Sequence, residues 1–150
     1  MAADRKRRLV VWFEKYLQNP PVRLALLAGL PLPPFALLET TGRSSGKPRR
    51  TPVIDGLVGD QFWIVAEHGR HAHYVRNLER DPHVRVKRRR RWHSGLARVL
   101  DHDDPLARAR WLADTLGPLH RADPTVARLL GTDLLIIRID LDHEPSQPNR

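Results

Sequence analysis

The chain has 150 residues, a length that suits one domain with one hydrophobic core and is too short for two. Lysine and arginine number 26 against 17 aspartate and glutamate residues, and the net charge of +9 predicts an anionic partner: a nucleic acid, an acidic membrane surface, or a ligand with phosphates or carboxylates. A hydrophobic content of 41% excludes a wholly disordered chain, and the absence of cysteine excludes disulfides, thiolate metal sites and cysteine nucleophiles.

The first part of the chain has the pattern of a helical extension. Apolar residues recur at helical spacing over residues 5–18, which predicts an amphipathic helix with a basic beginning. Core packing is its expected role, and contact with an anionic membrane surface is the alternative. Pro20 and Pro21 end this helix, and a short helix is predicted over 22–28. We therefore treat residues 1–34 as an N-terminal helical extension.

The next part of the chain has the pattern of β-structure. Strands are predicted over 36–41, 50–57 and 62–66, separated by a loop at 42–48 and a turn at 58–60. The third of these strands is continuously apolar, as expected for a strand that is buried on both faces.

A helix and a hairpin follow. The helix is predicted over 71–80, where apolar residues share one face, and Asp81-Pro82 ends it. A strand that begins near Val84 turns around Arg89 to Arg91 and returns over 92–100.

The C-terminal part contains two helix signals and one strand. An aspartate pair before Pro105 is typical of a helix start, so helices are predicted over 105–116 and, after a second Asp-Pro pair, over 123–131. Residues 134–141 form the last strand, and residues 143–150 are expected to be a disordered tail. Of the tryptophans, those at 12, 63 and 111 fall on predicted core faces.

Six strands joined mostly by hairpins exclude a doubly wound parallel sheet, in which strands and helices alternate throughout. The predicted fold class is α+β, a small antiparallel barrel or rolled sheet with peripheral helices. The chain contains no internal repeat and no linker long enough to divide it, so residues 1–150 are expected to form a single domain.

The most informative segment begins at the loop between the first two strands. Its two glycines let the backbone turn tightly and present consecutive amide N–H groups, the geometry of an anion-binding nest, and its cations and hydroxyl groups suit phosphate or carboxylate. It is not a P-loop, because the glycines enclose three residues instead of four and the lysine precedes proline. The alternative is a charged hairpin tip. The segment consists of Gly42, Arg43, Ser44, Ser45, Gly46, Lys47, Pro48, Arg49, Arg50, Thr51 and Pro52.

Together with three further segments, this loop resembles the deazaflavin-dependent nitroreductase family, split β-barrel oxidoreductases that use coenzyme F420. The four matching segments are LLETTGRSSGKPRRTPV at 37–53, VAEHGR at 65–70, YVRNL at 74–78 and DPHVRV at 81–86. The resemblance implies an FMN-binding-like split β-barrel and a cytoplasmic enzyme. That enzyme would transfer a hydride from reduced F420 to a small hydrophobic acceptor, namely a quinone, an enone or a nitro-compound.

The resemblance also implies where the coenzyme binds. The segment from Gly42 to Pro52 holds the phosphate and the polyglutamate tail, which agrees with the charge pattern. The deazaflavin ring lies along a second segment, Ala66, Glu67, His68, Gly69 and Arg70. Tyr74 is a candidate hydrogen-bond or proton donor on the substrate side, and a core aromatic is the alternative. Family members that reduce nitroimidazoles carry tyrosines near the C-terminus; this chain has only Tyr16 and Tyr74, so that activity is not expected.

Further hypotheses concern the cofactor, the function and the partners of the chain. FMN is the alternative cofactor, and a non-catalytic lipid-binding or flavin-binding protein at the membrane surface is the alternative function, because a fold does not decide its ligand. The run Lys87 to Arg91 with Trp92 suits a nucleic acid, but an arginine-rich hairpin turn is favoured and no specific nucleic-acid partner is expected. A homodimer is expected by analogy. His68, His71 and His73 are closely spaced, yet no metal site is expected there.

Overall fold

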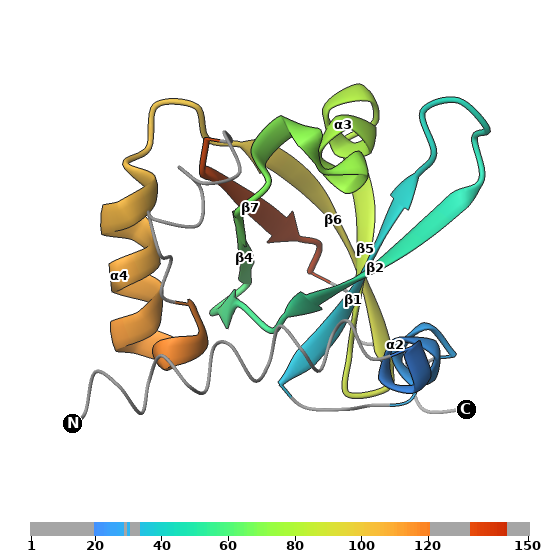
Figure 1. The fold of residues 1–150 in the computed structure, drawn as a ribbon, viewed down its shortest axis with the longest axis horizontal. Coiled ribbons are helices and arrows are strands. Elements are labelled where there is room, and N and C mark those ends of the chain that lie inside the picture. The colour runs from blue at the N-terminus through green and yellow to red at the C-terminus, as the bar shows by residue number, and fades with distance from the viewer. Residues whose placement is uncertain (1–19, 29, 31–33, 121–132, 144–150) are drawn as a thin grey trace.

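The computed structural model describes residues 20–28, 30, 34–120 and 133–143. Within these residues, seven strands form one antiparallel sheet in the order β2-β1-β5-β6-β7-β4-β3 (Figure 1). The strands are β1 (Phe35–Thr41), β2 (Pro48–Ile54), β3 (Leu57–Val58), β4 (Gln61–Ala66), β5 (His83–Arg88), β6 (Arg91–Val99) and β7 (Leu135–Leu141). The helices are α2 (Pro20–Leu27), η1 (Gly69–His71), α3 (His73–Arg80), α4 (Pro105–Leu116) and η2 (Pro118–His120).

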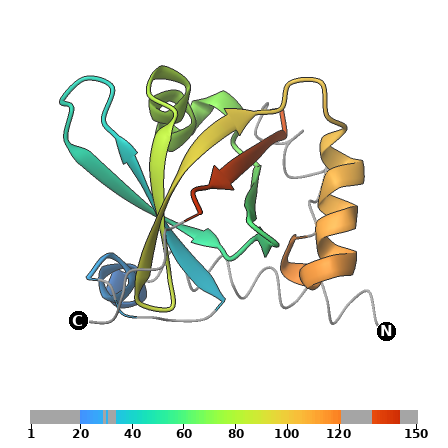
Figure 2. The ribbon, with the colours of Figure 1, turned by 180° about the vertical axis from the view of Figure 1, so that it is seen from behind.

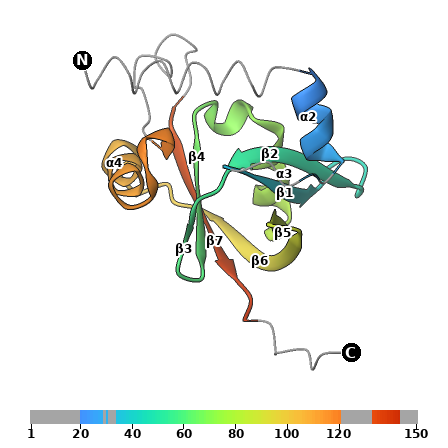
Figure 3. The same ribbon diagram turned by 90° about the horizontal axis from the view of Figure 1, so that it is seen from below.

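The sheet is strongly curled and open. Its edge strands, β2 and β3, each pair on one side only among the described residues, and the view from below shows how strongly the sheet bends (Figure 3). This arrangement confirms the predicted α+β split barrel.

Alternation along the strands separates an inner from an outer face. The inner face is apolar, and Leu38, Phe62, Val86 and Ile139 are completely buried there. Helix α3 packs against β1 and β6 and contributes Val75 and other apolar residues to this core. The helix therefore closes the opening of the curled sheet at one end.

A second, smaller core lies on the outer face beneath α4. Trp63 from β4, Leu112 from α4 and Ile136 from β7 form this cluster. Asp104 begins α4 as predicted, because its Oδ1 accepts hydrogen bonds from the amides of Leu106 and Ala107 at 3.1 and 3.2 Å. The predicted core position is confirmed for Trp63, which is buried, but not for Trp111, which is 38% exposed. The Trp111 ring packs edge-on against Trp63, with ring centroids 5.5 Å apart.

The strand predicted over 50–57 is confirmed over 50–54 as part of β2, but it does not continue to 57, because the chain bends after Ile54. The short strand β3 leaves the line of β2 and pairs with β4, which raises the strand count from the expected six to seven. Gly56 lies at the bend, where its carbonyl accepts a hydrogen bond from the amide of Trp63 at 3.0 Å. A Cβ at position 56 would collide with the carbonyl of Trp63, so the bend requires glycine.

Other predicted elements hold with small changes at their ends. The helix predicted over 71–80 is the turn η1 followed by α3, and the short helix predicted over 22–28 is α2. The β5–β6 turn lies at Arg89 and Arg90, as predicted, and both have positive φ. The predicted helices over 5–18 and 123–131, Trp12 and most of the predicted tail lie outside the described residues. In the part of the chain that the structure describes, no helix is long and apolar enough to cross a membrane.

Candidate functional site

The β1–β2 hairpin projects its connecting loop, residues 42–47, from one end of the barrel (Figures 1 and 2). The loop is closed on itself, because the amide of Gly42 donates to the carbonyl of Lys47 and the amide of Gly46 donates to the carbonyl of Gly42, both at 2.8 Å. Gly46 has a φ of +67°, which favours glycine over any side-chain-bearing residue.

The predicted row of consecutive free amides is shorter than expected. The amide of Arg43 donates to Oδ1 of Asn77 at 3.2 Å, and the amide of Lys47 donates to Oγ of Ser45 at 3.2 Å. Together with the two backbone hydrogen bonds, these contacts use four of the six amides in the described loop. The amides of Ser44 and Ser45 are the two in this loop that are left to donate hydrogen bonds to an anion.

The tip of the loop exposes cations and hydroxyl groups. Ser44, Ser45, Lys47 and Arg49 are all exposed, and Nη2 of Arg49 reaches Oγ of Ser45 at 3.5 Å. An open groove of about 450 Å³ begins at Thr41 and Pro48, the two residues that flank the loop. The tip therefore combines cations and hydrogen-bond donors, which can bind phosphate or carboxylate, with a groove beside them.

Asn77 on α3 fixes the start of this loop. The side chain is only 4% exposed, and its Oδ1 accepts from Nη1 of Arg43 at 2.9 Å as well as from the Arg43 amide. Its Nδ2 donates to Oγ1 of the buried Thr40 at 3.2 Å. Nη2 of Arg43 also reaches Nδ1 of His73 at 3.2 Å. Asn77 thus joins α3, β1 and the loop, and the prediction of site residues did not include it.

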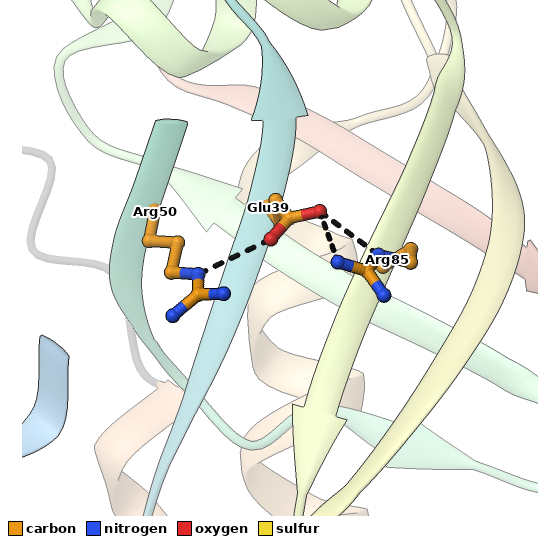
Figure 4. Close-up of polar contacts among 3 residues, drawn as sticks. All are labelled: Glu39, Arg50 and Arg85. Carbon is orange, nitrogen blue, oxygen red and sulfur yellow. Dashed lines mark hydrogen bonds and ion pairs between the residues drawn. The ribbon is translucent and has the colours of Figure 1, made fainter. Parts of the chain in front are cut away.

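Arg50, predicted to bind the tail, points elsewhere. Its Nε donates to Oε2 of Glu39 at 3.1 Å, while Nε and Nη2 of Arg85 donate to Oε1 at 2.8 and 2.7 Å (Figure 4). Glu39 is 8% exposed, so β2 and β5 each supply one arginine to a buried carboxylate on β1, the strand between them. The structure therefore separates Arg50 from the cations at the loop tip. Thr51 and Pro52 lie half-buried within β2.

Trp92 completes this arginine cluster on the outer face of the sheet. The guanidinium groups of Arg85 and Arg50 lie 4.6 and 5.0 Å from the centre of its ring, and Nζ of Lys87 lies at 5.7 Å. These cation–π contacts engage the ring within the protein. They weigh against the interpretation of Trp92 as a platform for a nucleic-acid base.

The second predicted segment, Ala66 to Arg70, is firmly held. Ala66 ends β4 and is 1% exposed, and Glu67 is half-buried. Gly69 is buried with a φ of +52°, and a Cβ there would collide with the carbonyl of Asp133. Nη2 of Arg70 donates to Oδ1 of Asp101 at 2.6 Å, and this hydrogen bond, together with the charge of Glu79, raises the pKa of Arg70. His68 is exposed.

Helix α3 connects the two predicted segments. Its residues His73 and Asn77 hold Arg43, and its residue Glu79 pairs with Nε of Arg70 at 3.2 Å. Arg76 adds a hydrogen bond from its Nε to the carbonyl of Arg70 at 2.7 Å. The two predicted segments therefore lie on two sides of one short helix, at the same end of the barrel (Figures 1 and 2).

Tyr74 packs against the inner core. Burial, followed by the negative charge of Glu67, raises the pKa of Tyr74 well above its usual value. The phenol therefore keeps its proton at neutral pH, so the group suits packing and hydrogen-bond donation better than proton exchange. Within the described residues, no three histidine or carboxylate side chains are placed to hold a metal ion.

The opposite end of the barrel contains a second hollow, which the sequence did not indicate. Its volume is about 290 Å³, and β2, β3, β5, the end of α4 and η2 contribute to its wall. The wall is mainly apolar, with Ile54, Leu57 and Leu116 among its residues, and it includes Asp55, Arg88 and His120. Nε and Nη2 of Arg88 each donate to one oxygen of Asp55 at 2.7 Å. We call this hollow the His120 pocket.

Comparison with known proteins decides the family. Residues 8–127 match the sequence pattern of a family described as F420H(2)-dependent quinone reductase. The chain belongs to this family. It is an F420-dependent oxidoreductase, and coenzyme F420 is its cofactor. No curated protein matches the chain.

Solved structures share the fold of this F420-dependent oxidoreductase. A structure described as F420-H2 dependent reductase FDR-A is 22% identical, with a TM-score of 0.52 over 71% of this chain and 94% of that one. HutZ, the haem storage protein from Vibrio cholerae, is 15% identical, with a TM-score of 0.53 over 74% and 83%. A third, described as a domain-swapped dimer, is 21% identical, with a TM-score of 0.54 over 84% and 98%. At these identities the likeness establishes the fold alone.

Proposed function

We propose that this F420-dependent oxidoreductase reduces a quinone-class acceptor. The observation that carries the proposal is the family match over residues 8–127, whose description names quinone reduction. Enones and nitro-compounds are the other acceptors that the family resemblance implies.

In this proposal the loop tip holds the coenzyme's tail. The tail carries a phosphodiester and several carboxylates, and the hydroxyls of Ser44 and Ser45 with the cations of Lys47 and Arg49 form a donor set of matching chemistry. Arg43 stands beside them, held by Asn77. Because Arg50 is bound to Glu39, we assign it a supporting role rather than direct contact with the tail.

Ala66 to Arg70 face the ring of the coenzyme in this proposal. When bound, reduced F420 supplies the hydride. The protein's part is to hold this segment rigid: the requirement for glycine at position 69 and the contacts of Arg70 with Asp101 and Glu79 fix its backbone. A fixed backbone presents its amides in one orientation and loses little entropy on binding.

The proposal is tested by mixing the purified protein with reduced F420 and one acceptor at a time, while the absorbance of oxidised F420 is followed. Menadione, cyclohexenone and a nitroaromatic represent the three acceptor classes. We expect the highest kcat/KM with menadione. Oxidation of the coenzyme at the protein-free rate with all three acceptors would contradict the proposal. FMN, titrated in parallel, tests the alternative cofactor.

The lipid-binding alternative makes a different prediction. A non-catalytic lipid-binding protein would co-purify with a fatty acid or another anionic lipid and would float with anionic liposomes without oxidising reduced F420. Mass spectrometry of bound lipids and the F420 oxidation assay therefore distinguish it from the oxidoreductase. We also propose a homodimer, supported by the fold's likeness to a domain-swapped dimer, which light scattering during size-exclusion chromatography tests.

A further inference from the structure

A group of exposed arginines lies at the turn between β5 and β6. Arg89, Arg90 and Arg91 are all exposed, and none of their side chains forms a hydrogen bond or an ion pair with another described residue. Arg88, directly before them, is bound to Asp55. The three guanidinium groups are therefore available to an anion outside the protein.

The turn has a conformation that does not favour arginine. Arg88 pairs with Arg91, so the turn consists of two residues, and Arg89 and Arg90 have φ values of +44° and +70°. Two positive φ values are typical of a type I′ turn, which prefers asparagine followed by glycine because bulkier side chains are strained there. The two arginines therefore make this turn less stable than Asn-Gly would, while they give it two exposed positive charges.

Apolar side chains from the end of α2 lie beside these arginines. Leu26 and Leu30 line a small pocket of about 120 Å³ together with Lys87 to Arg90. Leu30 follows α2 directly and is 56% exposed, and Leu24 within α2 is 66% exposed. The end of α2 and the β5–β6 turn lie side by side (Figures 1 and 2). We call Leu30, Arg89, Arg90 and Arg91 together the basic apolar surface.

We propose that the basic apolar surface docks on an anionic membrane. Arginines bind the phosphate groups of anionic lipids, and an exposed leucine beside them can enter the boundary between headgroups and acyl chains. Neither part needs the chain to cross the bilayer. Charge complementarity and the adjoining apolar side chain together select a lipid surface as the partner.

The docking surface is separate from the loop that is proposed to hold the coenzyme. Lys87 pairs with Leu37 near the start of β1, so the β5–β6 turn lies at that end of the strand, whereas the loop over 42–47 follows the other end. A docked molecule therefore keeps its coenzyme loop open to solvent. For this reason the inference does not depend on the acceptor or on the residues that bind the coenzyme.

A nucleic acid is the other large anion that exposed arginines can bind, but it fits this surface less well. Proteins hold single strands by stacking bases on available aromatic rings. Trp92 follows the arginines, yet its ring is engaged by Arg50, Arg85 and Lys87. A phosphate backbone also offers no apolar partner to Leu30, whereas a membrane offers a partner to both the charges and the leucine.

The first test is flotation of the full chain with vesicles of phosphatidylcholine alone and of an equal mixture with phosphatidylglycerol. We expect binding to the mixed vesicles only, and weaker binding as the salt concentration rises. No flotation with the mixed vesicles, or equal flotation with both kinds, would overturn the inference. Tighter binding to a DNA duplex than to the mixed vesicles at the same salt concentration would also overturn it.

A variant of the turn gives the second test. Arg89→Asn with Arg90→Gly removes two charges and introduces the pair that the turn prefers, so we expect a raised Tm and an affinity for mixed vesicles that is lower by about tenfold or more. Lys47→Ala with Arg49→Ala removes the same charge at the coenzyme loop and should bind vesicles as the wild type does. An equal loss in both variants, or no loss in the turn variant, would contradict the proposed surface.

A fluorescent probe tests the orientation of the docked protein. The chain has no cysteine, so Leu30→Cys or Ser44→Cys can each carry one environment-sensitive label. We expect the emission of the label at position 30 to shift to shorter wavelength with mixed vesicles, and the label at position 44 to stay unchanged. A shift at position 44 alone would overturn the inference. The turn variant should keep its F420 affinity and its activity with menadione, so loss of docking and loss of the proposed function are distinguishable.

Discussion

Asn77 and His120 are both buried polar side chains, but they differ in how their polar atoms are satisfied. Asn77 is 4% exposed, and both of its amide atoms form hydrogen bonds, to Thr40 and to Arg43. His120 is 8% exposed, and its ring nitrogens form no hydrogen bond of good geometry, although the backbone carbonyls of Asp55 and Gly117 lie close enough to act on the ring. Asn77 contacts the loop between β1 and β2, whereas His120 lies in the wall of the His120 pocket.

The difference separates a polar group that stabilises the fold from one that does not. A buried polar group whose partners all belong to the protein fixes the relative positions of those partners, as Asn77 does for α3, β1 and the loop. A buried polar group without well-formed hydrogen bonds lowers stability instead, because its desolvation is not compensated. Glu39 belongs with Asn77, because both of its carboxylate oxygens are bound by arginines.

The largest effect should come from removing Asn77. In Asn77→Leu, the amide of Arg43 and the hydroxyl of Thr40 lose their partner, and we expect the free energy of unfolding to fall by about 2–4 kcal/mol. Asn77→Asp keeps an acceptor for Arg43 and can accept from Thr40, so it should lose about 1 kcal/mol. Urea unfolding measures both. Equal stability of wild type and Asn77→Leu would contradict the structural role.

Glu39→Gln should have the next largest effect. Both arginines lose their ion pair, the amide oxygen can still accept a hydrogen bond from one of them, and the amide NH2 group faces the other, which it cannot serve as an acceptor. Both arginine side chains are about two-fifths exposed and can be hydrated, so the loss should be about 1–2 kcal/mol, below the 3–5 kcal/mol typical of a fully buried pair. Urea unfolding again measures it. A loss above that range would mean that the outer face is less hydrated than the structure indicates.

His120→Leu should leave stability unchanged or raise it by up to about 1 kcal/mol, since it removes a buried group that forms no hydrogen bond of good geometry. Thermal and urea unfolding of the protein without ligands measure this. A clear loss of stability would place His120 with Asn77 as a structural group and break the contrast between them.

The smallest effect is a difference in the pH dependence of stability. The folded chain holds His120 with a lowered pKa, whereas the unfolded chain binds the proton near the ordinary value of 6.5. As pH falls below that value, the unfolded state takes up more protons and the folded state loses stability. His120→Leu should lose less stability than wild type between about pH 7.5 and about pH 5.5. Parallel curves for the two proteins would argue against the lowered pKa.

Local patterns predicted most of the fold. The antiparallel hairpins, the cap at Asp104 and the turn at Arg89 and Arg90 depend on residues that are close in the sequence. The bend at Gly56 was missed because glycine is required there by the carbonyl of Trp63 on the neighbouring strand. Trp111 was misplaced because helical spacing locates one face of α4 but not where that face meets solvent.

The candidate site was harder to predict, since it depends on contacts between distant segments. Composition found the cations at the loop, but not that Glu39 would draw Arg50 away from them. Asn77 carried one available signal: it is a polar residue on the apolar face of a short helix. The His120 pocket had no comparable signal, because its wall comes from several separate parts of the chain.

The account depends most directly on the loop tip as the binding site for the coenzyme's anionic tail, and a titration of oxidised F420 fluorescence tests it. Two double variants remove the same charge at opposite ends of the barrel: Lys47→Ala with Arg49→Ala at the loop tip, and Arg89→Ala with Arg90→Ala at the β5–β6 turn. We predict saturable binding to wild type, an affinity lower by about tenfold or more for the loop variant, and unchanged affinity for the turn variant. No binding to wild type, or an equal loss in both variants, would contradict the account.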